Sequence, residues 1–100
     1  MQQTPPTSRR LLNDLLTLTP CDTVTEAARL LECTRTTLHE QLAGHREMSP
    51  TQAIRLARLL RRSSLEVVAA TQYHQARREA DRMLWLGLWQ VARERAPMVL

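Results

Sequence analysis

Apolar side chains recur at helical spacing along most of the chain. The spacing is present in four segments that precede residue 63: 9–18, 24–31, 35–43 and 50–60. In the second segment, Val24, Ala27, Ala28 and Leu31 occupy positions i, i+3, i+4 and i+7. Residues at this spacing lie on one face of an α-helix and can be buried together. The pattern therefore predicts four short amphipathic helices.

Polar residues that favour helix ends stand at the borders of these segments. Ser, Thr and Asp side chains can accept hydrogen bonds from the first backbone N–H groups of a helix, and a Glu or Gln three residues later can complete a capping box. Gly44 is a helix stop signal. The predicted capping pairs are Thr23 with Glu26, Ser49 with Gln52 and Ser63 with Glu66, and Thr34 is a further cap. These residues predict where the helices begin.

Both ends of the chain differ from this central part. Residues 1–8 contain Pro5 and Pro6 among polar neighbours, and we expect a flexible arm that packs no core. Residues 63–96 contain no strong helix breaker before Pro97. The polar stretch 78–81 allows a turn there, so the pattern leaves open whether this part forms one helix or two.

Composition strengthens the helical prediction. The chain has 17 Leu and 11 Ala among 100 residues, but only three aromatic residues and no Phe. Such a composition favours helices and argues against a β-sandwich or barrel. No apolar run is long enough to span a membrane, and the polar start does not resemble a signal peptide. Cys21 and Cys33 do not form a disulfide framework, so we expect a cytoplasmic protein, either bacterial or in the host of a phage.

The charge pattern points weakly toward nucleic acid and away from catalysis. The net charge is +4, and all 14 Lys and Arg positions are arginine. Arginine suits planar contacts with phosphates and guanine edges. No Ser/His/Asp, Cys/His or Gly-rich phosphate motif is present, so we expect no enzyme. Cys33 and His39 lack the spacing of a zinc site, and we expect no metal or cofactor.

The short helices predicted at 24–31 and 35–43 are separated by a three-residue turn, as in a helix-turn-helix. This part of the chain resembles the lambda-repressor-like (XRE) DNA-binding family, and is most similar to small phage, prophage and antitoxin-type regulators. The matching residues are Thr25, Glu26, Ala27, Ala28, Arg29, Leu31, Thr34, Arg35, Thr37, Leu38, Gly44 and Arg46. The chain departs from the family pattern at Glu32, where glycine is usual in a left-handed turn, and at Gln41, which is often apolar. Leu42 is expected to take over the packing of Gln41.

The resemblance implies an all-α, four-to-five-helix lambda-repressor-like domain over residues 9–62, followed by a C-terminal helical extension over 63–96. It also implies that the helix at 35–43 reads DNA in the major groove. Expected base contacts are Arg35, Thr36, Thr37, His39 and Glu40. Expected phosphate contacts are Thr23, Thr25, Thr34, His45 and Arg46.

The tail is apolar on more than one side of its predicted helix. A surface helix of a small monomer needs only one apolar stripe, so the excess predicts a second partner surface. The expected homodimer interface consists of Leu84, Trp85, Leu88, Trp89 and Val91. A dimer would match an inverted-repeat operator.

We therefore expect a homodimeric, sequence-specific regulator of transcription that binds double-stranded DNA. A phage- or prophage-type repressor is the first expectation. Two alternatives share the same DNA-binding part. One is an antitoxin-type autorepressor that binds a toxin, and the other is a phage activator that contacts RNA polymerase. A membrane partner is not expected, because acidic residues flank the short apolar tail.

Overall fold

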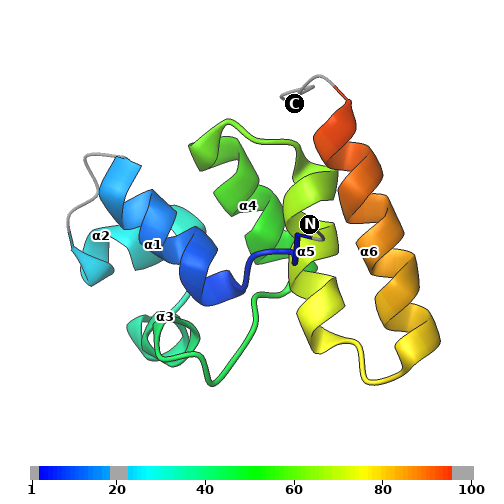
Figure 1. The fold of residues 1–100 in the computed structure, drawn as a ribbon. Helices are drawn as coiled ribbons and strands as arrows, with labels where there is room; N and C mark the ends of the chain where they lie inside the picture. Colours follow the sequence, from blue (N-terminus) through cyan, green and yellow to red (C-terminus); the bar gives the residue numbers. More distant parts are fainter. Residues whose placement is uncertain (1–2, 19–22, 96–100) are drawn as a thin grey trace.

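The computed structural model describes residues 3–18 and 23–95, which form six helices (Figure 1). They are α1 (Ser8–Leu18), α2 (Val24–Leu31), α3 (Arg35–Leu42), α4 (Pro50–Leu60), α5 (Ser64–Gln75) and α6 (Glu79–Glu94). The described residues contain no strand, and the prediction of an all-α fold is confirmed for them. None of these helices combines the length and the apolarity that crossing a membrane requires.

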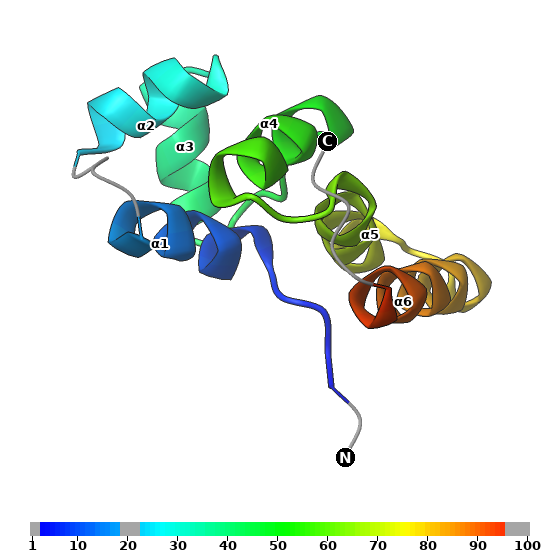
Figure 2. The same ribbon diagram turned by 90° about the horizontal axis from the view of Figure 1, so that it is seen from above.

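Helix α4 lies at the centre of the arrangement. Helices α1, α2 and α3 lie on one side of it, and α5 and α6 lie on the other (Figures 1 and 2). α4 packs against α1, α2 and α5, and α6 packs against α5. Its buried face consists of Gln52, Ala53, Leu56 and Ala57. One continuous core therefore runs from the leucines of α1 to Trp89 of α6.

Each predicted cap forms its hydrogen bond. The hydroxyls of Thr23, Thr34, Ser49 and Ser63 accept from backbone N–H groups three residues later, with N···O distances of 3.1, 3.0, 3.2 and 3.4 Å. These bonds satisfy donors that a helix start would otherwise leave unpaired. The starts of α2 to α5 thus follow from local sequence.

The Gln52 side chain does not complete the capping box that its position predicts. It is buried, and it forms two reciprocal amide hydrogen bonds with Gln41, with N···O distances of 2.8 and 2.6 Å. Gln41 is itself only 1% exposed, whereas Leu42 is only partly buried. The expectation that Leu42 replaces Gln41 in the core is therefore wrong. The amide pair makes burial of Gln41 possible, because each amide satisfies the other.

The C-terminal part forms two helices, which settles what the sequence left open. α5 and α6 run antiparallel and lie side by side in both views (Figures 1 and 2). The break covers residues 76–78 and lies slightly before the polar stretch 78–81. Glu79 and Asp81 fall in the first turn of α6, where carboxylates interact favourably with the helix dipole.

The N-terminal arm is not free over residues 3–8, which corrects the expectation for this segment. Pro5 is buried, and its carbonyl oxygen lies 2.7 Å from Nε2 of His74 on α5. Ser8 is also buried, and its hydroxyl donates to Glu47 at 3.0 Å and accepts from the Met48 N–H at 2.8 Å. The arm packs against α5 although it contains two prolines, because the Pro5 side chain is buried and its carbonyl oxygen is an acceptor for the His74 ring.

The turn between α2 and α3 adopts the predicted left-handed backbone. Glu32 has φ 54° and ψ 44°, and the N–H of Cys33 bonds to the carbonyl of Ala28 at 3.0 Å. This is the hydrogen-bond pattern with which helices often end at glycine. Arg61 ends α4 in the same way, with φ 56°. Both residues carry a Cβ in a region that favours glycine.

We predict that Glu32→Gly raises the free energy of unfolding by about 1 kcal/mol, because glycine removes the Cβ strain of the left-handed backbone. The gain exceeds the loss of the exposed Glu32–Arg55 ion pair, whose oxygen and nitrogen lie 3.0 Å apart. Urea denaturation of the two proteins measures the difference. Glu32→Ala is the control, because it loses the ion pair but keeps the strain, and it should not stabilise. A lower stability of Glu32→Gly would contradict this account of the turn.

Candidate nucleic-acid interface

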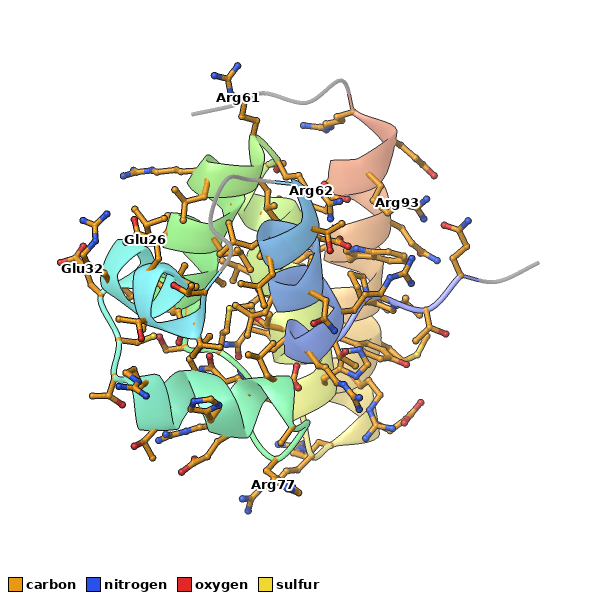
Figure 3. The ribbon with its side chains drawn as sticks, turned by 90° about the vertical axis from the view of Figure 1, so that its left-hand side faces the viewer. Glu26, Glu32, Arg61, Arg62, Arg77 and Arg93 are labelled. Atoms are coloured by element: carbon orange, nitrogen blue, oxygen red, sulfur yellow. The ribbon has the colours of Figure 1, made fainter. Side chains whose placement is uncertain are left out.

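Helix α3 buries one face and presents the other to solvent. Leu38 and Gln41 are buried, and Leu42 packs partly against the core. Arg35, Thr36 and His39 are exposed. Because α3 is only eight residues long, its position depends on these buried contacts and not on its own helix propensity. Figure 3 shows α3 along the lower edge of the molecule.

The first turn of α3 carries a network of hydroxyls. The Thr34 hydroxyl donates to Oγ1 of Thr37 at 2.9 Å and accepts from the Thr37 N–H. Arg46 donates to Oγ1 of Thr37 at 3.3 Å and pairs with Glu40 at 3.4 Å. Thr37 and Glu40 thus already have partners in the protein. Arg35, Thr36 and His39 are the predicted base contacts whose side chains form no hydrogen bond or ion pair with another described residue.

The loop after α3 brings His45 and Arg46 beside the end of that helix. Gly44 takes φ 84°, and the N–H of His45 bonds to the carbonyl of Glu40 at 2.9 Å. Both basic side chains are exposed. The loop then enters the core at Met48, which is 0% exposed. A histidine and an arginine therefore stand on a loop whose two ends, at α3 and at Met48, are fixed to the fold.

The predicted phosphate contacts at the start of α2 are less clearly arranged to bind an anion than the loop after α3 is. Thr23 is exposed, and its hydroxyl caps α2; Thr25 is exposed in the first turn. Glu26 pairs with Arg29, and the hydrogen bond from Arg29 lowers the pKa of the Glu26 carboxyl. A carboxylate so close to the helix start reduces the attraction of this end for a phosphate.

The loop between α5 and α6 adds two arginines that the sequence analysis missed. The amide of Gln75 donates to the carbonyl oxygen of Met48 at 2.7 Å, which ties the end of α5 to the loop that follows α3. Arg77 and Arg78 follow directly and are exposed. Figure 3 shows Arg77 at the same lower edge as α3, and Arg61 at the opposite edge. The polar stretch in the sequence signalled a helix break, but only the tertiary contact shows that the end of α5 is tied to the loop that follows α3.

The predicted dimer residues separate into two groups on α6. Leu84, Leu88 and Val91 are 67%, 42% and 44% exposed, and Met83 beside them is 52% exposed. Trp85 packs partly against the core. Trp89 is 4% exposed and belongs to the core of the same chain, so it must be removed from the predicted interface. We call Met83, Leu84, Leu88 and Val91 the α6 stripe.

No group of three or more potential metal ligands comes together within the described part of the chain. Cys33 packs against the core, and burial raises the pKa of its thiol, so it is a poor thiolate at neutral pH. Cys21, which we expected in a loop, lies outside the described residues.

Comparison with known proteins identifies no relative: no protein-family model, no curated protein and no solved structure matches this chain. Functional inference therefore depends on the residues and geometry of the chain itself.

We predict that Arg77→Ala/Arg78→Ala reduces the salt dependence of binding to a non-specific DNA duplex. Each lost phosphate contact should lower the slope of log Kobs against log salt by about 1. Fluorescence anisotropy at several salt concentrations measures the slope. Arg61→Ala is the matched control, because it removes an exposed arginine from the opposite edge of the molecule. Equal slopes in the double variant and the control would exclude the α5–α6 loop from the interface.

Proposed function

We propose that the protein is a sequence-specific regulator of transcription that binds double-stranded DNA, with α2 and α3 as its helix-turn-helix. The main support is the face of α3. A short helix, joined to its neighbour by a tight left-handed turn, exposes Arg35, Thr36 and His39 while Leu38 and Gln41 hold it to the core. This is the arrangement that a major-groove reader requires, since side chains near the helix start must reach base edges.

Three side chains on this helix, those of Arg35, Thr36 and Glu40, offer chemistry that suits a base edge. The Arg35 guanidinium can donate two hydrogen bonds to O6 and N7 of guanine, and the methyl group of Thr36 can contact a thymine methyl. Glu40 can accept from cytosine N4 once it exchanges Arg46 for the base, because the exposed ion pair is weak. Arg46, released in that exchange, would contact a phosphate.

Contacts between basic side chains and DNA phosphates would accompany the base contacts of α3. His45 and Arg46 lie on the loop after α3, and Arg77 and Arg78 lie on the loop after α5. The Gln75–Met48 hydrogen bond joins these two loops. Contacts to phosphates set the position of a protein on DNA but carry no sequence information themselves. In this proposal, specificity comes from the start of α3, and the two basic loops supply salt-dependent affinity.

We propose further that the protein acts as a homodimer through the α6 stripe. Four large apolar side chains at helical spacing are exposed on one helix, which is unusual for a monomer of this size. Gly87 lies among them and leaves open space where a side chain would stand, which permits close approach of a second helix. α6 lies on the far side of the molecule from α3 (Figure 2), so pairing through α6 leaves both α3 helices exposed. A two-fold dimer suits an inverted-repeat operator, and occupying such an operator would block the polymerase.

Selection of genomic DNA fragments by the purified protein tests the DNA-binding proposal. We expect enrichment of one inverted repeat, and Arg35→Ala should lower the affinity for it by about 1–3 kcal/mol while non-specific binding persists. Arg61→Ala serves as the control and should retain the operator. Sequence-independent retention that is equal in Arg35→Ala would reject specific recognition by α3.

The dimer prediction requires a separate measurement. Leu84→Glu/Leu88→Glu places two charges in the α6 stripe, and it should weaken self-association at least about tenfold, because buried unpaired charges are costly. Sedimentation equilibrium compares the mass with that of the 11.5 kDa chain. Leu65→Glu is the control, because Leu65 is 46% exposed but lies on α5. A wild-type protein that stays monomeric at micromolar concentration would contradict the proposed interface.

A further inference from the structure

A cavity of about 550 Å³ lies away from the exposed face of α3. Its walls come from the arm, α1, the junction of α4 with α5, and α6, so it includes no residue of α3. The charged lining residues are Arg10, Asp14, Arg62, Glu66 and Arg93, and Trp89 is also part of the lining. The volume is in the range of sites that hold small molecules.

The charges in this cavity do not balance. Arg62 pairs with Asp14, with the two atoms 3.3 Å apart. Arg10 and Arg93 then remain opposite a single carboxylate, that of Glu66, and neither has an ion-pair partner among residues 3–18 and 23–95. Arg93 instead lies over the ring of Trp89, 4.6 Å from the ring centre. Two guanidinium groups at one cavity thus have N–H donors without an acidic partner, and this favours the binding of an anion.

A second observation concerns the indole of Trp89. The side chain is 4% exposed, and its Nε1–H has no acceptor among the described residues. Buried indole N–H groups usually have a hydrogen-bond partner, and a buried donor without one lowers stability. Trp89 is also part of the cavity wall, so its indole N–H signal reports on a ligand bound there.

We propose that this cavity binds a small molecule that carries a phosphate group. A phosphate monoester has three acceptor oxygen atoms and a charge of about −1.5 to −2 at pH 7, which suits two guanidinium groups better than the two oxygen atoms and single charge of a carboxylate. The volume exceeds what a bare phosphate needs, so the ligand is a phosphate monoester with a small organic part. Glu66 can accept a hydrogen bond from a hydroxyl of that part, which makes a sugar phosphate the best match. The proposal does not depend on DNA binding by α3.

The indole N–H signals of ¹⁵N-labelled protein test this site. The two tryptophans give two signals, and Trp85→Phe identifies that of Trp89. Ribose 5-phosphate is the probe, and ribose and sodium chloride at matched ionic strength are the controls. We expect a saturable shift of the Trp89 signal with ribose 5-phosphate alone. Arg10→Gln should raise the dissociation constant at least about tenfold, as expected for loss of a charge-assisted hydrogen bond.

Arg61→Gln is the matched variant, because this exposed arginine does not line the cavity, and it should bind as the wild type does. Overlay of the backbone amide spectra shows whether Arg10→Gln keeps its fold. A linear response that sodium chloride reproduces, or equal affinity in Arg10→Gln, would overturn the site. Equal affinity for inorganic phosphate and ribose 5-phosphate would support the anion site but overturn the role of the organic part.

Discussion

Close packing around α4 is the constraint on which the remaining structure depends. Ala53, Leu56 and Ala57 of α4 are each 0% exposed and face helices on both sides. Small alanine side chains allow neighbouring helix backbones to approach closely, and leucine fills the space between them. Because the α1–α3 group and the α5–α6 pair meet mainly through this helix, α4 sets how the face of α3 lies relative to α6.

The short helix α3 depends on this framework for its orientation. An eight-residue helix is not stable alone in water, so tertiary contacts determine where its exposed side points. Leu38 supplies apolar burial, and the Gln41–Gln52 amide pair fixes the position of α3 against α4, because both hydrogen bonds form only when the two amides lie close together and in line. The buried pair thus links one defined position on α3 to one defined position on α4. It holds the exposed start of α3 at a defined angle.

Hydrogen bonds between the arm, the loop after α3 and α5 join the parts of the molecule that carry the proposed functions. The arm reaches α5 through the Pro5–His74 contact, and Ser8 links α1 to the loop after α3. Gln75 links that same loop to the loop that carries Arg77. The arm and α1 also form walls of the cavity beside Trp89. The proposed DNA-binding face, the cavity and the α6 stripe therefore occupy different surfaces of one connected core.

Local sequence determined the helical class and the starts of α2 to α5, because caps and apolar spacing act over a few neighbouring residues. The left-handed backbone at Glu32 was expected from the resemblance and not from the local sequence. Local sequence also indicated which side of α3 is exposed, since Leu38 marks the inner face. Only the tertiary structure decided that Gln41 is buried, that Pro5 lies against α5, that Trp89 belongs to the core, and that the end of α5 is tied to the loop after α3. Each of these depends on a partner distant in sequence: the amide of Gln52, the ring of His74, the α5 surface and the carbonyl of Met48. Periodicity along one segment specifies which face is apolar, but it contains no information about which distant group will satisfy a polar atom on that face.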